Sequence, residues 1–167
     1  KSKAIIFMSG TLHSKNVLKN IFGIKEFATV EAETLNQGAI EILMTGKEFD
    51  CKHANFVSKK YSRKDYLEAL ECCIKKSETP SLIHVNAFMD LPSEQEKIEN
   101  GIFSVSSREK LRQTQMEDKT GRLVSIFKQG LSDTLFTTKC SRGIDFPGDT
   151  CKSVIFTKYP YPNIKNT

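Results

Sequence analysis

The sequence lacks the long hydrophobic run that a membrane-spanning helix requires. Its longest uninterrupted apolar run covers only residues 4–8, whereas a membrane helix needs about 20 such residues. The same run is too short for the hydrophobic region of a secretory signal, and the polar turn Ser9-Gly10-Thr11 follows it at once. We therefore expect neither a membrane segment nor secretion.

Cysteines are few, odd in number and irregularly spaced. The chain has 5 cysteines in 167 residues, whereas a secreted disulfide scaffold usually has an even and denser set. We interpret them as reduced thiols of an intracellular protein. This would place it in the cytoplasm or nucleoid of a prokaryote, or in the nucleus of a eukaryote.

Two common chemical motifs are also absent. No G-x-x-x-x-G-K-[ST] phosphate loop occurs, so the chain lacks the main lysine cradle for ATP. The three histidines lie far apart in sequence, and the C-x-H and C-C spacings are not usual for zinc ligands. We predict no metal site within this chain.

The amino-acid composition is typical of a single globular domain. Hydrophobic residues make up 38% and charged residues 27% of the chain. Lys and Arg together number 25 against 20 acidic residues, which gives a formal net charge of +5. This excess is compatible with a polyanionic partner but does not require one. Because the first residue is Lys rather than Met, we expect this chain to be part of a larger protein.

Short apolar runs alternate with amphipathic segments along the chain. The clearest helix is expected after Ser62, and shorter ones after Ser14, after Ser93 and around residues 123–127, with a polar helix or loop after Ser107. Residues 46–60 show no clean period and are expected to be a connection. Strands are expected at residues 4–8, 81–86, 102–105, 133–138 and 152–158, with further extended pieces at 27–30 and 39–44.

The helix after Ser62 has a distinct apolar stripe. The stripe consists of Tyr66, Leu67, Leu70, Cys73 and Ile74. Charged residues are expected largely outside it, namely Lys64, Glu68, Glu71 and Lys75. The alternation of strands and helices predicts an α/β fold with a mostly parallel central sheet and helices on both of its faces.

Ligands of open parallel sheets bind beyond the carboxyl ends of strands, so the loops after strands are candidate sites. In the first such loop, Ser9, Gly10 and Thr11 can offer hydroxyl and N–H groups to a phosphate or to a neighbouring domain. An ordinary strand-to-helix turn is the alternative. In the second loop, Asn86 and Phe88 can contact a nucleic-acid backbone or a base face. The alternative is that Asn86 is a turn residue and Phe88 a core residue.

The third loop, at residues 136–149, is the richest. Gly143 permits a close backbone approach, and Asp145 can hold a metal-bound water, a ribose hydroxyl or a basic partner. An ordinary turn explains residues 147–149 well, but it explains residues 138–145 less well. The polar and basic candidates in this loop are Thr138, Lys139, Ser141 and Arg142.

Four segments together resemble the XPD/DinG-type superfamily 2 DNA helicases. Residues 5–12, IIFMSGTL, resemble motif III, and residues 81–88, SLIHVNAF, look like the motif IV strand. Residues 141–149, SRGIDFPGD, are similar to motif V, and residues 154–163, VIFTKYPYPN, resemble the segment that follows it. Each motif alone is weak, but four in the family's order are fairly specific.

The resemblance implies that residues 1–167 are the second RecA-like motor domain of such a helicase, incomplete at its carboxyl end. It further implies that residues 1–24 are a docking segment between the two motor domains. The expected partners are single-stranded DNA and the first motor domain of the same protein. ATP and Mg²⁺ are expected in the full-length enzyme, and an iron–sulfur cluster only in its first half. No cofactor is expected on this chain alone.

The family also implies roles for individual residues. Motif V, with Gly143 and Asp145, couples the nucleotide and DNA sites. Nucleotide or inter-domain contacts are implied for Ser9, Gly10, Thr11 and Asp145. DNA contacts follow from our interpretation of the two later loops, through Asn86, Phe88, Thr138, Lys139, Ser141 and Arg142. The family's phosphate loop, acidic metal motif and arginine finger are missing here.

Two other classes of protein remain alternatives. One is a stand-alone α/β module that binds nucleic acid or protein without motor activity. The other is a small-molecule transferase or reductase with a doubly wound fold.

Overall fold

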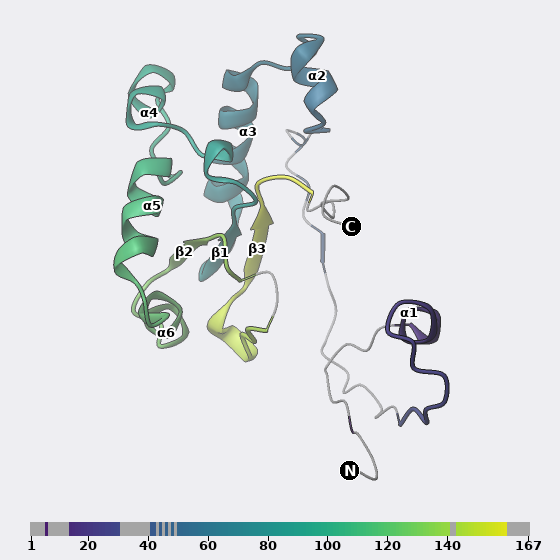
Figure 1. Cartoon of the computed structure of the whole chain (residues 1–167). Helices are drawn as coiled ribbons and strands as arrows, with labels where there is room; N and C mark the ends of the chain where they lie inside the picture. The colour runs from purple at the N-terminus through teal and green to yellow at the C-terminus, as the bar shows by residue number, and fades with distance from the viewer. Residues whose placement is uncertain are drawn as a thin grey trace. The chain divides into compact units, whose positions relative to one another are not determined.

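The structure, a computed structural model, describes residues 6, 14–30, 41, 42, 44, 46, 48, 50–140 and 143–159 (Figure 1). The chain divides into two compact units, Lys1–Glu41 and Ile42–Thr167. Of the expected strand at residues 4–8 only Ile6 is described, and of the extended piece at 39–44 only residues 41, 42 and 44; the rest of both segments lies outside the described residues. The docking role of residues 1–24 stays a prediction.

The first unit contains one described helix, α1 (Lys15–Asn20). The hydroxyl of Ser14 accepts a hydrogen bond from the N–H of Val17 at 3.4 Å, which is the cap expected from the sequence. The described residues 27–30, expected to be extended, form no strand ladder. Thus the helix of this unit was predicted correctly.

The second unit is built on a three-stranded parallel sheet. Its strands are β1 (Ser81–His84), β2 (Thr134–Thr137) and β3 (Ser153–Phe156), in the order β2-β1-β3. His84 is in register with Thr137 on one side and with Phe156 on the other. Because all three strands run in the same direction, their carboxyl ends meet at one edge of the sheet (Figure 1).

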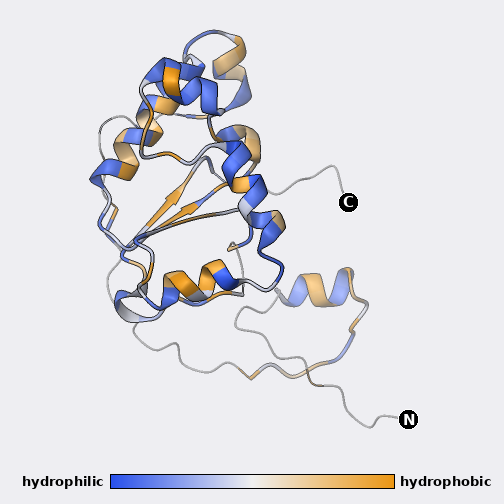
Figure 2. Ribbon diagram, turned by 90° about the vertical axis from the view of Figure 1, so that its left-hand side faces the viewer, coloured by the Kyte–Doolittle hydropathy of each residue, from blue (hydrophilic) through white to orange (hydrophobic). Residues whose placement is uncertain are grey.

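Helices cover both faces of this sheet. On β1, Ile83 belongs to a core cluster with Leu67 and Leu70 of α3 (Arg63–Lys76), whereas Leu82 packs with Phe127 of α6 (Arg122–Lys128). Successive strand residues point to opposite faces, so α3 and α6 lie on opposite sides. The strands are mainly apolar and sit between helices of mixed polarity (Figure 2). The structure confirms the predicted three-layer α/β class, which is that of RecA-like domains.

Serine caps begin three of the helices where the sequence predicted them. Ser62 and Asp65 form a reciprocal capping box at α3, and Ser93 forms another with Glu96 at α4 (Glu94–Asn100). The hydroxyl of Ser107 accepts the N–H of Lys110 at 3.1 Å and begins α5 (Arg108–Glu117). The remaining short elements are α2 (His53–Val57), η1 (Phe88–Asp90) and η2 (Gly148–Thr150).

Three sequence predictions about this unit are wrong. The expected connection at residues 46–60 contains the helix α2. Residues 102–105 form no strand, because the N–H groups of Phe103 and Ser104 donate to the carboxylate of Glu71, at 3.2 and 2.9 Å, instead of to a neighbouring strand. Glu71 was expected to lie outside the apolar stripe. It is instead buried, with 6% of its surface exposed, where its carboxylate accepts these two hydrogen bonds.

Candidate nucleic-acid interface

The loops that leave the carboxyl edge of the sheet carry most of the described candidate residues. Residues 85–90 follow β1, residues 138–147 follow β2 and residues 157–159 follow β3. Since β1 is paired to both other strands, the loop after β1 starts between the other two. The sheet therefore brings together segments that lie about 50 residues apart in sequence.

The loop after β1 is fixed to the end of β3 by a buried network around Asp90. The hydroxyl of Thr157 donates to Oδ2 of Asp90 at 3.1 Å, and the N–H of Ala87 donates to the same oxygen at 2.9 Å. The N–H of Asn86 donates in turn to the hydroxyl of Thr157 at 3.1 Å. Tyr66 of α3 donates its hydroxyl to the carbonyl of Thr157 at 3.1 Å. These bonds connect the loop after β1 with the end of β3 and with α3.

Two cations complete this network. Lys158 forms an ion pair with Oδ1 of Asp90 at 3.0 Å. Arg63 donates to the carbonyl of Leu91 at 2.7 Å and pairs with Glu96 at 3.1 Å. The start of α3 is thereby tied to the end of η1.

Phe88 packs inward. Its half-buried ring contacts the main core cluster, and the guanidinium of Arg112 lies over the ring at 5.1 Å. A ring covered in this way offers little surface to a nucleic-acid base, so the geometry favours the alternative of a core residue for Phe88. Asn86 is half-buried, and its side-chain oxygen has no hydrogen-bond partner among the described residues.

The loop after β2 begins with one anchored residue and one exposed cation. The hydroxyl of Thr138 donates to Oε1 of Gln115 on α5 at 3.0 Å. Lys139 donates its backbone N–H to the hydroxyl of Thr137 at 3.0 Å, while its side chain is exposed to solvent. The positive charge of Lys139 is thus presented on a fixed backbone at the carboxyl edge of the sheet.

Further along this loop, Gly143 has a φ of +73°, a left-handed conformation that favours glycine. Asp145 is exposed, and no described residue hydrogen-bonds to its carboxylate. The other predicted site residues lie outside the described part of the chain. These are Ser9, Gly10, Thr11, Ser141 and Arg142.

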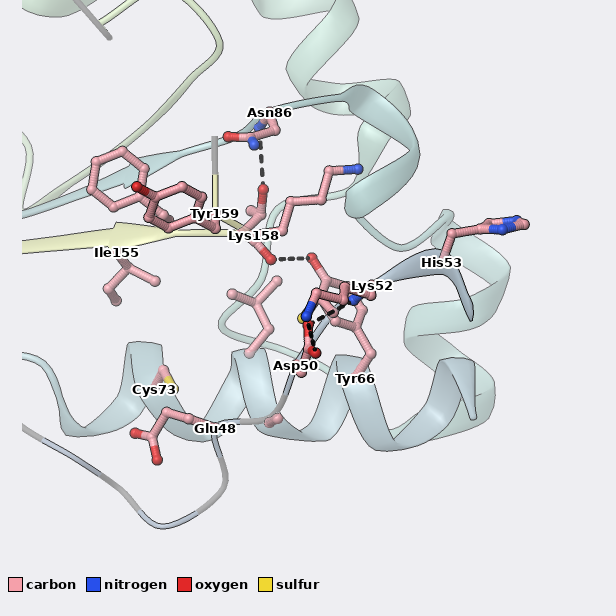
Figure 3. Close-up of a pocket in the computed structure, with 15 residues that line it drawn as sticks. Glu48, Asp50, Lys52, His53, Tyr66, Cys73, Asn86, Ile155, Lys158 and Tyr159 are labelled. Atoms are coloured by element: carbon pink, nitrogen blue, oxygen red, sulfur yellow. Dashed lines mark hydrogen bonds and ion pairs between the residues drawn. The ribbon is translucent and has the colours of Figure 1, made fainter. Parts of the chain in front are cut away.

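A cavity of about 580 Å³ lies beside Asn86 (Figure 3). Its walls come from the end of β3, from α3 and from residues 48 and 50–53, and its lining includes Tyr66, Cys73 and Ile155. Within the lining, Lys52 pairs with Asp50 at 3.0 Å. The cavity is therefore apolar at its α3 wall and charged near residues 50–52.

A smaller cavity of about 260 Å³ lies where the loop after β2 meets α5 and α6. Its lining includes Gln115, Lys119 and Lys139. Asp118 also lines it, but the carboxylate of Asp118 accepts the N–H groups of Arg122 and Leu123, at 2.7 and 3.1 Å. These hydrogen bonds, chiefly that from Leu123, lower the pKa of Asp118.

Sequence reasoning missed the residues that hold the two loops. The sequence predicts for Thr157 and Lys158 only a strand end within the segment that resembles the one after motif V, and for Arg112 and Gln115 only a polar helix or loop. The one available signal was the spacing of three between Arg112 and Gln115, which places both on one helical face. The sequence does not show which helix packs beside the sheet, so this spacing alone does not mark the two residues as part of a site.

Other possible sites have little support. All five cysteines lie in the described part of the chain and none is in a disulfide, while burial raises the pKa of Cys51, Cys140 and Cys151. Among the described residues, no three His, Cys, Asp or Glu side chains are grouped as a metal site would require. None of the described helices is both long and apolar enough to span a membrane.

Comparison with known proteins identifies the family. Residues 70–167, which include β1, β2, β3 and both loops of the interface, match the family model of the helicase C-terminal domain. Neither the curated proteins nor the solved structures gave a significant match. Because the family match covers more than half of the sequence, this chain belongs to the family of helicase C-terminal domains.

Proposed function

We propose that this chain is the second motor domain of an XPD-like, ATP-dependent DNA helicase that couples ATP hydrolysis to movement along single-stranded DNA. The observation that carries the proposal is the family match over residues 70–167, which includes the two loops at the carboxyl edge of the sheet. The order of the four sequence motifs supports the finer assignment to an XPD-like enzyme. DNA repair is the process in which we place it.

The proposed DNA contacts are of two kinds. Lys139, exposed at the start of the loop after β2, and Arg142 would bind backbone phosphates through their charges. Asn86, Thr138 and Ser141 would add hydrogen bonds from the two loops. Such contacts fix the protein on a strand without reading its sequence, as a translocating motor requires.

The chemistry of ATP hydrolysis would need a second domain. Phosphoryl transfer requires a phosphate cradle and bound Mg²⁺, and usually an arginine finger, and the sequence contains no recognisable form of any of them. ATP and Mg²⁺ would be bound mainly by the first motor domain, which would also hold an iron–sulfur cluster. On this side, Asp145 and Gly143 would couple the nucleotide site to the DNA site, and Ser9, Gly10 and Thr11 would contact nucleotide or the other domain.

The sequence of the full-length protein is the first test. A phosphate loop before this chain and a Q-x-x-G-R-x-x-R motif after it are expected. If the full-length protein has neither, the helicase proposal is wrong, and a stand-alone binding module becomes the better interpretation.

Binding of single-stranded DNA is the second test, measured by fluorescence anisotropy at several salt concentrations. We expect weak binding, micromolar or weaker, because one motor domain offers only half of the track. The double variant Lys139→Ala with Arg142→Ala should bind several-fold more weakly. A matched control removes Lys76 and Lys152, two exposed lysines near the amino ends of β1 and β3. Equal losses from both pairs would show that net charge, rather than this interface, holds the DNA.

A further inference from the structure

One face of α5 contacts both loops of the proposed interface. The helix packs against η1 in the loop after β1 and against β2. Arg112 lies over the ring of Phe88 at 5.1 Å, and three residues later Gln115 accepts a hydrogen bond from Thr138 at 3.0 Å. Residues three apart in a helix share a face, so α5 joins the two loops.

We propose that α5 is a third part of the single-stranded DNA interface, in which Arg112 binds a backbone phosphate and Gln115 positions the loop of Thr138 and Lys139. The inference rests on the function proposed above, and it adds residues that no motif of the sequence indicates.

The surroundings of Arg112 make its charge available. Arg108, one turn earlier, is engaged in ion pairs with Glu96 and Glu109 at 3.8 and 3.0 Å. Arg112 is exposed, and its guanidinium packs on the ring of Phe88 instead of on a carboxylate. A guanidinium placed over an aromatic ring still has N–H groups that can bind two oxygens of one phosphate.

Gln115 has an unused donor next to two lysines. Its Nε2 atom is buried and has no hydrogen-bond partner among the described residues. The residue lines the cavity of about 260 Å³ together with Lys119 and Lys139. An oxygen of the DNA backbone at the mouth of this cavity would meet both positive charges. Gln115 would meanwhile keep Thr138, and with it the start of the loop, in place.

The experiment measures the binding of a fluorescein-labelled oligothymidylate to this chain, by anisotropy over a range of salt concentrations. We expect Arg112→Ala to weaken binding by about threefold to tenfold and to reduce the salt slope by about 0.7, the value for one phosphate contact with a single strand. Arg112→Lys should keep the slope because it keeps the charge. Gln115→Ala should weaken binding and leave the slope unchanged, since it removes no charge.

Two control variants match these substitutions. Lys76→Ala removes one positive charge at the opposite end of the sheet from the interface. Gln113→Ala removes an exposed amide of the same helix, one that bonds to Glu117 at 3.0 Å. Thermal unfolding of each variant establishes that it is folded. If Gln115→Ala does not fold, Gln115→Asn replaces it, because it keeps the amide but shortens the side chain.

The outcomes separate this inference from the proposed function. If Arg112→Ala and Gln115→Ala lose no more affinity than their controls while Lys139→Ala still weakens binding, the role of α5 is wrong and the proposed interface stands. If the wild-type chain does not bind the oligonucleotide at all, both are wrong. If affinity falls in the α5 variants and in Lys139→Ala but not in the controls, the role of α5 and the proposed function are both supported.

Discussion

The hydroxyl of Thr157 donates a hydrogen bond to the carboxylate of Asp90 over 3.1 Å, although 67 residues separate them in sequence. Thr157 directly follows β3, and Asp90 ends the short helix η1 after β1. The same hydroxyl accepts the N–H of Asn86. One small side chain therefore connects the ends of two neighbouring strands, at the carboxyl edge of the sheet where the proposed interface lies.

Replacing Thr157 with Val should remove this connection without a large change in volume. The N–H of Asn86 and the carboxylate of Asp90 would each lose a partner in a buried site, which costs about 1–3 kcal/mol of unfolding free energy. The exposed substitution Thr120→Val should change it by less than about 0.5 kcal/mol. Urea unfolding of both variants measures the difference. Equal stabilities would show that the network does not support the loop.

Glu71 offers a comparison within one helix. Its buried carboxylate accepts the N–H groups of Phe103 and Ser104 and pairs with Lys75 at 2.8 Å, whereas Glu68 is exposed and lies 3.7 Å from Lys64. We expect Glu71→Gln to lower the unfolding free energy by about 1.5–3 kcal/mol and Glu68→Gln by about 0.5 kcal/mol or less. A loss as small for Glu71 as for Glu68 would contradict this account.

The same carboxylate has a defined pH dependence. Burial alone would raise the pKa of Glu71, but the hydrogen bonds from Lys75, Phe103 and Ser104 outweigh it and lower the pKa. The stabilisation by Glu71 is therefore complete at neutral pH. It is lost as the pH falls from the ordinary value of 4.5 through the lower pKa of the folded state.

The elements that depend on local chemistry were predictable from sequence, and those that depend on long-range partners were not. Ser14, Ser62, Ser93 and Ser107 begin helices because each hydroxyl binds an N–H three residues later, which a linear pattern shows. The strands β1, β2 and β3 were recognised from their apolar runs. The segment 102–105 has the same apolar character, but its N–H groups bind Glu71, about 30 residues away.

The candidate site shows the same division. The loops after β1 and β2 were predicted, because the carboxyl ends of parallel strands gather at one edge. For Phe88 the sequence left two possibilities open, contact with a nucleic-acid base and a place in the core. The structure favours the core because the ring packs on the main cluster and lies under Arg112 of α5, a segment that the sequence did not distinguish between helix and loop. Gln115, which holds Thr138, was missed for the same reason.

His84 should make the stability sensitive to mildly acidic pH. It is buried at the end of β1, where its ring packs edge-on against Phe156 at a centroid distance of 5.4 Å. Burial lowers the pKa of His84 below its ordinary value of 6.5. The unfolded chain therefore takes up a proton before the folded chain does, so stability is complete above pH 6.5 and falls as the pH drops below it.

Melting temperatures at about pH 7.5 and about pH 5.5 test this difference. The wild-type chain should lose more thermal stability between these values than His84→Gln, which cannot titrate. His53→Gln removes an exposed histidine of α2 and should behave as the wild type does. If His84→Gln retains the full pH dependence, another group is responsible.

Purified alone, this chain should not hydrolyse ATP, because the groups that phosphoryl transfer requires are not recognisable in its sequence. Release of inorganic phosphate, measured with and without single-stranded DNA, gives the answer. A DNA-stimulated ATP turnover that follows the chain through successive purification steps would contradict the proposal that ATP hydrolysis needs the first motor domain.

In the full-length protein, Asp145→Ala should lower the DNA-stimulated ATPase and the unwinding rate several-fold while leaving the fold intact. The carboxylate of Asp145 is exposed and receives no hydrogen bond from a described residue, so its loss should cost less than about 0.5 kcal/mol of stability. A carboxylate that only capped a turn would predict the reverse, about 1 kcal/mol of lost stability with normal turnover. Melting temperature and ATPase rate measured on one preparation separate the two. Asp149→Ala, at a second exposed acidic residue in η2 of the same loop, is the control and should change neither.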